Sequence, residues 1–451
     1  MLPIEENELM CRVGPGTVMG DFIRQYWIPA IMPQDLAEPD GRLRRLRLLG
    51  EDLIAFRDTS GRPGIMRHNC PHRGASLFFG RNEDDGLRCV YHGWKFDVSG
   101  RCVDMPNEPP ESNFKEKVRA SAYTCEERNG IIWTYMGQRE TAPPLPDLLP
   151  NLDPNCRIWT RLEECSYMQA LEGDIDTSHF GFLHAGHVRL DQLLPGSCDY
   201  YALKQRHARF ESKEHEIGAS YAAIRPAEEG TEYWRMGHYM LPFYTINAPG
   251  VLGIKNSCIA WVPLDDHNTM VWNIGRQVLD PELSGVGGLK VGWIRQDPQG
   301  RYDPYAPRQR GQAFVRQFEP ETSDWLGMYR PIANKDNDYL MDFELQKSGA
   351  TFTGLPNPAQ DPMAQETMGP IYDRSQEHLG TADMMIIRTR QKLLKAARAF
   401  DDGAPAPGVD NPEIFRMRGG GALLPKGANG LDDLADLHFA RAELSDVLAQ
   451  A

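Results

Sequence analysis

Two short segments of the chain carry paired cysteines and histidines. The first reads CPHRG from Cys70 to Gly74, and the second reads CVYHGW from Cys89 to Trp94. Together they follow the pattern C-x-H, sixteen intervening residues, then C-x-x-H. Two thiolates and two imidazoles on paired loops suit a [2Fe-2S] cluster with cysteines on one iron and histidines on the other. The four predicted cluster ligands are Cys70, His72, Cys89 and His92.

A zinc site is the alternative for these side chains, since zinc binds the same donors in a tetrahedron. The order of the ligands argues against zinc, because each loop supplies one cysteine and one histidine, whereas a zinc finger pairs like residues on separate elements. Gly74 and Gly93 follow the histidines, and glycine turns release backbone N–H groups that can point at cluster sulfides. The pattern therefore favours a Rieske-type cluster, which carries electrons.

A second group of possible metal ligands lies in LEGDIDTSHFGFLHAGH, residues 171–187. Histidines with nearby carboxylates suit a ferrous site of the two-histidine, one-carboxylate type, which leaves coordination positions open for dioxygen and substrate. The other interpretation is a polar helix end with solvated histidines. The candidate side chains are Glu172, Asp174, Asp176, His179, His184 and His187.

Helix geometry limits how these side chains can meet. We expect residues 166–187 to be helical, and on an ideal helix positions i and i+4 share a face while i+5 lies about 140° away. Asp176 and His179 then share a face that His184 does not. For both histidines to bind one metal, the helix must be broken or bulged between them, and Gly181 is placed to allow that.

The elements that position these groups indicate two domains. With 451 residues, 41% hydrophobic and 25% charged, the chain has the size and composition of a globular protein with more than one core. Short β-rich runs between turn residues fill 43–137, which predicts an antiparallel sandwich with the ligand loops between strands. The proline-rich stretch 141–155 is expected to join the domains.

The second domain is predicted to be α+β. Strand-like runs occur between 209 and 278, and the apolar spacing over 363–400 predicts one long helix. Strands followed by long helices indicate an antiparallel sheet with helices on one face.

Charge and cysteine usage exclude several classes of protein. The net charge of -14 argues against nucleic-acid binding, which needs a basic surface. No run of about 20 apolar residues is present, and the first residues carry glutamates where a signal peptide has lysines. The remaining cysteines show no paired spacing, which favours reduced thiols. We therefore expect a cytoplasmic protein with no membrane partner.

In these motifs the chain resembles the α subunits of Rieske non-heme iron ring-hydroxylating oxygenases. The family motif D-x-x-H-x-x-x-x-H is met by Asp176, His179 and His184, and the runs 12–30 and 360–380 are similar to the phthalate dioxygenase branch. The resemblance implies an α+β protein with an N-terminal Rieske-type antiparallel β sandwich. It also implies a C-terminal helix-grip-like domain, an antiparallel sheet covered by helices.

The resemblance also sets the expected domain bounds. We expect an N-terminal lead segment packing on the catalytic domain (1–42), a Rieske [2Fe-2S] domain (43–140), the Pro-rich junction (141–155) and a catalytic mononuclear iron domain (156–451).

The family's third iron ligand is an aspartate far downstream of the histidine pair, which the resemblance places at Asp361. The competing interpretation is that Asp361 only caps the long helix, with Pro362 as its first residue. Asp373 and Asp383 are the fallback candidates, expected to lie deeper in that helix.

The resemblance gives Asp176 a separate role. In relatives this carboxylate bridges a cluster histidine of one subunit to an iron histidine of the next, which implies contact between His92 of one copy and Asp176 of another in a homotrimer or stacked trimers. The role of Glu172 stays open between a hydrogen-bond partner of the iron ligands and a charge on a wet helix.

The implied activity is that of a terminal oxygenase component that hydroxylates an aromatic compound, expected to be an aromatic carboxylate, with O2. No dinucleotide or flavin motif is present, so electrons must come from NAD(P)H through a separate flavin/iron-sulfur reductase. An O-demethylase of a methoxylated aromatic acid is the alternative reaction. A pure electron-transfer Rieske protein and a zinc scaffold are alternatives of other classes.

An aromatic carboxylate calls for a cationic side chain in the pocket. The candidates are Lys204, Arg206, Arg209 and Arg235, each of which can equally be a surface charge.

Overall fold

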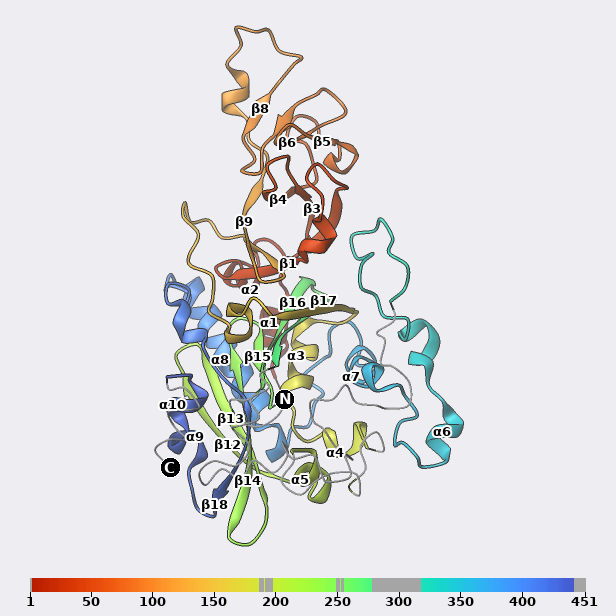
Figure 1. The fold of residues 1–451 in the computed structure, drawn as a ribbon, viewed down its shortest axis with the longest axis vertical. Helices are drawn as coiled ribbons and strands as arrows, with labels where there is room; N and C mark the ends of the chain where they lie inside the picture. The colour runs from red at the N-terminus through yellow and green to blue at the C-terminus, as the bar shows by residue number, and fades with distance from the viewer. Residues whose placement is uncertain are drawn as a thin grey trace.

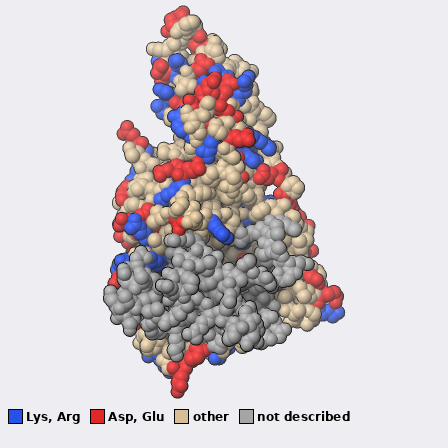
Figure 2. All heavy atoms as spheres, viewed as in Figure 1, with Lys and Arg blue, Asp and Glu red and all other residues tan. Residues whose placement is uncertain are grey.

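The computed structural model describes residues 2–185, 190, 198–248, 252, 255–277 and 318–441. Figure 1 shows the early strands in an upper lobe, with the long strands β12–β17 and most of the helices below it. Acidic and basic side chains are interspersed over the described residues on the face in Figure 2, with no continuous basic stripe.

Two antiparallel sheets build the upper lobe. The six-stranded sheet has the order β1-β10-β9-β4-β3-β2, and the four-stranded sheet has the order β5-β6-β7-β8. The hairpin between β9 and β10 turns at Asn129 and Gly130, both with positive φ, as a tight two-residue turn requires. The strands are β1 (Trp27–Ile31), β2 (Arg44–Leu48), β3 (Glu51–Arg57), β4 (Pro63–Arg67), β5 (Arg81–Glu83), β6 (Gly86–Arg88), β7 (Lys95–Phe96), β8 (Cys102–Asp104), β9 (Ala122–Arg128) and β10 (Ile131–Tyr135).

The two cysteine-histidine segments are loops of this lobe. Residues 70–74 lie between β4 and β5, and residues 89–94 lie between β6 and β7. The core beneath them includes Leu77, Leu87 and Phe96, all fully buried. The predicted arrangement of antiparallel strands with intervening ligand loops is therefore confirmed.

The lower part is built on one large antiparallel sheet. Its order is β11-β17-β16-β15-β14-β13-β12, and β18 pairs with β14. The strands are β11 (Arg157–Glu163), β12 (Arg209–His215), β13 (Gly218–Pro226), β14 (Thr231–Met240), β15 (Tyr244–Ile246), β16 (Lys255–Asp265), β17 (Asn268–Gln277) and β18 (Gly420–Pro425).

Helices α3 and α8 contact this sheet and each other. Leu393, Leu394 and Ala397 bury one side of α8. The α+β fold with helices on an antiparallel sheet, predicted as helix-grip-like, is confirmed. The helices are α1 (Ile4–Cys11), α2 (Val18–Ile23), α3 (Tyr167–Ile175), α4 (Phe180–Leu183), α5 (Cys198–Lys204), α6 (Phe343–Lys347), α7 (Asn357–Glu366), α8 (Met384–Asp401), α9 (Gly430–Asp433) and α10 (Ala435–His438).

The N-terminal segment contacts both parts of the molecule. Helices α1 and α2 pack against α8, whereas β1 joins the six-stranded sheet by pairing with β10. The proline-rich stretch is irregular apart from a short 3-10 helix at Leu149–Leu152. The domain bounds expected from the sequence remain a prediction.

The single long helix predicted over 363–400 is wrong. Helix α7 ends at Glu366 and α8 begins at Met384. Gly369 has φ 93° and is followed by Pro370, a pair that cannot continue a helix. The apolar spacing belongs to α8 alone.

Candidate functional site

The two cluster loops share one backbone geometry. The N–H of Gly74 donates to the carbonyl of Cys70 at 2.9 Å, and the N–H of Gly93 donates to the carbonyl of Cys89 at 3.0 Å. Both glycines have positive φ, 78° and 77°, a conformation that favours glycine. Each loop thus turns back on itself directly after its histidine.

The side chains of the loops form two pairs. The rings of His72 and His92 have centroids 4.4 Å apart. Burial raises the pKa of the Cys70 thiol to about 11, and the neighbouring Cys89 thiol also acts to raise it. Within the described ranges, no three of the four donor atoms come within 4.8 Å of one another. A tetrahedral zinc ion draws its donors to spacings of about 4 Å, so this arrangement fits two irons better.

One ring nitrogen in these loops is orphaned. Nδ1 of His92 is buried and lacks a hydrogen-bond partner among the described residues, which is the state of a metal-binding nitrogen without its metal. The ring of His72 stacks on Trp94 at 4.3 Å, and Nε1 of Trp94 donates to Asn107. The loops therefore fit a cluster with its cysteines inside and its histidines toward the surface.

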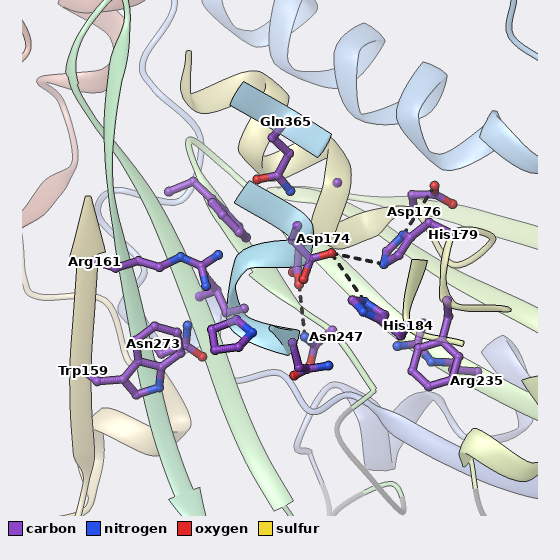
Figure 3. Close-up of a pocket in the computed structure, with 17 residues that line it drawn as sticks. Trp159, Arg161, Asp174, Asp176, His179, His184, Arg235, Asn247, Asn273 and Gln365 are labelled. Carbon is purple, nitrogen blue, oxygen red and sulfur yellow. Dashed lines mark hydrogen bonds and ion pairs between the residues drawn. The ribbon is translucent and has the colours of Figure 1, made fainter. Parts of the chain in front are cut away.

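His179 and His184, two of the side chains predicted to bind the second iron, lie near each other in Figure 3. Oδ1 of Asp361 is 3.6 Å from Nε2 of His179 and 3.4 Å from Nε2 of His184. The three ligand atoms lie within 4.8 Å of one another, and no other such group occurs among the described histidines, cysteines and carboxylates. Two imidazoles and one carboxylate that converge in this way fit a divalent iron ion.

The helix break is not where the sequence predicted it. Helix α3 ends at Ile175, and the extended backbone of Asp176 (ψ 119°) interrupts the helix before His179 rather than after it. Oδ1 of Asp176 accepts from the N–H of Ser178 at 2.6 Å, a local turn that competes with the helix. Gly181 lies inside the short α4, so its predicted role as the break is wrong.

The short helix α4 separates the two histidines. His179 stands directly before α4 and His184 directly after it, and their ring centroids are 5.1 Å apart. Phe182 and Leu183 both donate their N–H groups to the carbonyl of His179. One closed turn thus brings both rings to the same metal position. His187 lies outside the described residues.

Asp361 is not a helix cap. Helix α7 begins at Asn357, so Asp361 and Pro362 lie inside it, and the capping interpretation is wrong. Burial acts to raise the pKa of Asp361, but its hydrogen bond with His184 and the two imidazole charges hold it below its usual value.

Each iron histidine has a different outer partner. Nδ1 of His179 lies 3.5 Å from Oδ2 of Asp176, whereas Nδ1 of His184 lies 2.6 Å from Oε1 of Gln360. The Gln360 amide is oriented by donation from its Nε2 to Thr353 Oγ1 and to the carbonyl of Leu355. Because its oxygen faces His184, Nδ1 carries the proton and Nε2 is free to bind metal.

A cavity of about 350 Å³ opens beside the three ligands. Its apolar walls suit a flat ring. They come from Trp159, Phe180, Ile259, Trp261 and Pro358. Its polar lining, besides the ligands and Asp176, comes from Arg161, Asp174, Arg235, Asn247, Asn273, Asn357 and Gln365. Figure 3 shows Arg161 and Arg235 on opposite sides of Asp174 in this view.

Of the four cations proposed from sequence, Arg235 lines the cavity. Arg209 instead forms ion pairs with Glu211 and Glu232. Arg206 lies 4.4 Å from the centre of the Phe182 ring, and Lys204 lies over Tyr200.

Comparison with known proteins agrees with this geometry. The Rieske [2Fe-2S] domain family matches residues 26–122, and the LigXa C-terminal domain-like family matches residues 134–282 and 312–430. The 3-chlorobenzoate-3,4-dioxygenase oxygenase subunit of Comamonas testosteroni is 40% identical over 94% of this chain and 95% of that protein. This chain belongs to the Rieske non-heme iron oxygenases.

Two further comparisons agree, one in sequence and the other in fold. The phthalate 4,5-dioxygenase oxygenase subunit of Pseudomonas putida is 35% identical to this Rieske oxygenase over 92% of its chain and 90% of that protein. Dicamba monooxygenase, solved with dicamba bound, shares the fold with a TM-score of 0.53 at 16% identity, over 85% of this chain and 99% of that chain. The resemblance to α subunits of the phthalate dioxygenase branch is confirmed.

The Rieske oxygenase is thus a terminal oxygenase component. It carries a [2Fe-2S] cluster and a mononuclear catalytic iron. The electron-carrier and zinc-scaffold alternatives are therefore wrong. In the described ranges, the helices lack the combined length and apolar character needed to cross a membrane.

Glu172 has a structural role in the Rieske oxygenase. Its buried carboxylate accepts from Arg374 at 2.9 Å and from Arg390 at 2.6 Å, and Arg390 also pairs with Glu377. Both earlier hypotheses for Glu172, a hydrogen bond to the iron ligands and a wet surface charge, are wrong.

The two fallback carboxylates do not contact the iron histidines. Asp373 accepts from Ser375, and Asp383 accepts from the N–H of Gly380. Asp373 lies in the loop after α7, and Asp383 ends the short 3-10 helix Thr381–Asp383 directly before α8, so neither lies deep in a long helix.

Asp174, one of the six candidate side chains from sequence, lies in the cavity wall but is not among the three converging ligands. It accepts from Thr245 Oγ1 at 2.5 Å and from Asn247 Nδ2 at 3.1 Å. Burial raises its pKa, while these bonds and the charge of Arg235 act to lower it.

Arg161 and Glu163 were missed by sequence reasoning. Arg161 lines the cavity, and its Nε donates to Oε1 of Glu163 at 2.8 Å. Burial raises the pKa of Glu163 to about 7, although Arg161 acts to lower it. Arg161 and Glu163 are two residues apart and therefore lie on the same face of a strand. No signal in the sequence showed that this face meets the cavity.

Proposed function

We propose that this Rieske oxygenase holds its mononuclear iron with His179, His184 and Asp361. The observation that carries the proposal is that these three side chains converge at the wall of a 350 Å³ cavity. Two imidazoles and one carboxylate leave coordination positions free on the cavity side. Iron bound there supplies the oxygen-activating chemistry of the family.

The cluster is held by Cys70, His72, Cys89 and His92. The paired thiols, the paired imidazoles and the unpartnered Nδ1 of His92 support this assignment. Because imidazole is neutral, the histidine-bound iron is the more easily reduced of the two.

Electrons cross from one copy of the chain to the next at Asp176. Oδ2 of this carboxylate faces His179 at 3.5 Å, and its side chain keeps 24% of its surface exposed. His92 is half-buried in the upper lobe, beside Val90 and Tyr91, which are 59% and 54% exposed. Because one edge of this carboxylate is exposed, it can accept a hydrogen bond from His92 of a neighbouring copy.

Such a contact makes a closed ring of copies. Phe182 and Phe352 are exposed next to the iron site, and their ring centroids are 5.7 Å apart. The cluster loops, with their own exposed apolar residues, lie in the upper lobe (Figure 1). Two different surfaces on one chain form a head-to-tail contact, and a threefold rotation between copies closes such a contact into a ring. A homotrimer, alone or stacked on a second one, satisfies this requirement.

The substrate is an aromatic carboxylate that this Rieske oxygenase hydroxylates. Trp159 and Trp261 provide flat apolar walls, and Arg161 and Arg235 provide cations in the same cavity. O-demethylation is the second candidate reaction, because the 5,5'-dehydrodivanillate O-demethylase oxygenase subunit of a Sphingobium strain is 31% identical.

The electron donor is an NAD(P)H-dependent flavin/iron-sulfur reductase. Carbazole 1,9a-dioxygenase, a structural neighbour with a TM-score of 0.52, was solved in complex with a ferredoxin. The cytoplasm remains the proposed location, since none of the described cysteines forms a disulfide.

A single-turnover experiment tests the proposed function. Chemically reduced protein, without reductase, is given O2 and a panel of aromatic monocarboxylates, dicarboxylates and methoxylated acids. We expect up to one hydroxylated or demethylated product per mononuclear iron from at least one acid, and none from His179→Ala. A fully iron-loaded wild type that oxidises neutral aromatics but none of the acids would overturn the substrate class.

A further inference from the structure

The two arginines of the cavity differ in where their counter-charges lie. Arg235 shares the cavity wall with Asp174, whose carboxyl is within reach of the Arg235 charge. An anion that approaches Arg235 therefore also meets the field of Asp174. Because two opposite charges on one wall largely cancel, this side of the cavity is polar but close to neutral.

The carboxylate that pairs with Arg161 lies outside the cavity. Glu163 is fully buried, does not line the cavity, and accepts from both Nε and Nη2 of Arg161 with the single oxygen Oε1. Nη1 of Arg161 donates to no residue that the structure describes. The cavity therefore meets a guanidinium with an unused amino group, whose hydrogen-bonded carboxylate lies outside the cavity. The cavity carboxylate within reach of its charge is Asp361, which is committed to the iron.

Strand β11 places the Arg161 side chain next to a surface for a ring. Trp159 and Arg161 are two residues apart, so both project from one face of the strand, and both line the cavity. Trp159 is paired in register with Asn273 of β17, which also lines the cavity. A flat apolar face and an amide thus lie near the Arg161 side chain (Figure 3), whose guanidinium carbon is 5.7 Å from the centre of the Trp159 ring.

We propose that Arg161, rather than Arg235, binds the carboxylate of the aromatic substrate, and that Glu163 holds Arg161 in position for this contact. The inference rests on the proposed function, from which it takes the carboxylate class. A guanidinium fixed on one edge keeps its remaining N–H groups preorganised for a planar anion. The ring of the acid then lies along Trp159, while Arg235 and Asp174 contact its other polar substituents.

The alternative is that Arg161 acts on the iron ligand Asp361, whose pKa its charge helps to lower. Substrate binding and iron retention separate the two roles. An anchor for substrate changes the affinity for acids without changing the iron content, whereas support of Asp361 changes the iron content first.

The experiment measures dissociation constants by calorimetry under argon, on protein with its cluster and iron, for benzoate, 3-chlorobenzoate and phthalate and for the matching neutral amides. The variants are Arg161→Gln, Arg161→Lys, Arg235→Gln and the double variant Arg161→Gln/Glu163→Gln, which leaves no unpaired buried carboxylate. Arg157→Gln is the matched control, because Arg157 lies on the same strand but is exposed. Iron content and the cluster spectrum are recorded for each protein.

We expect Arg161→Gln and the double variant to weaken binding of the acids by about 10- to 100-fold, with a smaller loss for Arg161→Lys. Affinity for the amides and the iron content should remain unchanged in both variants, and Arg157→Gln should behave as the wild type.

Two results overturn the proposal, and they are distinguishable. If the wild type binds acids and Arg161→Gln binds them equally well, or loses iron in proportion to its loss of binding, the anchor is wrong while the carboxylate class stands. If the wild type prefers the amides or binds no acid of the panel, both the anchor and the carboxylate class fail.

Discussion

The cluster loops and the iron site both bring metal ligands together, but the cluster ligands lie close together in the sequence within each loop and the iron ligands do not. Each cluster loop supplies one cysteine and one histidine within four residues and is closed by its own backbone hydrogen bond. The iron site joins α4 to α7, with Asp361 177 residues after His184. One centre is therefore a property of two short motifs, whereas the other exists only when distant helices dock.

Contacts between α3 and α7 hold the iron site together. Nε2 of Gln169 on α3 donates to the carbonyls of Gln365 and Gly369 at the end of α7. Gly173 has no side chain where the Gln365 amide packs, and a Cβ there would lie 2.1 Å from its Nε2. The two helices approach closely because a glycine faces a glutamine, and this approach brings Asp361 to the histidines.

The largest expected effect comes from two separate variants, each of which removes one ligand from one of the two metal centres. Cys89→Ala should lose the cluster and keep the mononuclear iron, whereas His184→Ala should lose that iron and keep the cluster spectrum. Both variants should have no measurable turnover. Metal analysis with electron paramagnetic resonance checks the result, and loss of both centres in either variant would show that the two sites are not independent.

Asp176→Asn tests the link between the two centres. The amide is nearly isosteric and keeps the turn with Ser178, so both centres should remain bound. Turnover should nevertheless fall by about 100-fold or more, because the bridging carboxylate is lost. Steady-state oxygen uptake with reductase measures this effect, and a variant with full activity would remove the bridging role.

Gln360→Leu tests the hydrogen-bond partner of His184, which sequence reasoning missed. Without the amide oxygen, Nδ1 of His184 has no acceptor, and the ring is free to rotate or change tautomer. We expect iron affinity to fall by about 10- to 100-fold, measured by competition with a chelator. Gln360→Glu keeps an acceptor and should retain most of the affinity. Equal losses in the two variants would contradict the proposed tautomer control.

The smallest expected effect is a pH dependence of the free energy of unfolding, caused by three histidines packed beside the large sheet. His215, His238 and His438 pack together between β12, β14 and α10. Burial lowers the pKa of His215 to about 3 and lowers the pKa of the other two. The charged groups that act on them, besides one another, are Lys213, Lys392, Asp432 and Arg441.

The sign follows from the lowered pKa values. The folded state favours neutral imidazole, so this stability is present above the unfolded pKa of about 6.5 and is lost as the pH falls toward the folded values. For fully buried His238 the loss is at most about 1.4 kcal/mol per pH unit. Denaturant unfolding between pH 7 and 5 measures it, and His238→Gln should reduce the slope. An unchanged slope in that variant would show that His238 does not contribute.

The same contrast explains what the sequence alone could predict. Cys70, His72, Cys89 and His92 follow from spacing because the loops are local, and the family motif led to His179, His184 and Asp361, which the fold brings together. The break at Asp176 was misplaced because a side-chain hydrogen bond, rather than Gly181, interrupts the helix. Gln360 and Arg161 were missed because one is adjacent to a ligand and the other faces a cavity formed by several strands and helices.

Mixing the two ligand variants tests the central claim most directly. Chains with Cys89→Ala and chains with His184→Ala, each inactive alone, are co-expressed with different tags and purified as a mixed oligomer through both tags. If electrons pass from the cluster of one chain to the iron of its neighbour, the mixed oligomer regains a substantial fraction of wild-type turnover. A mixed oligomer that keeps one intact centre of each kind but makes no product would contradict the account.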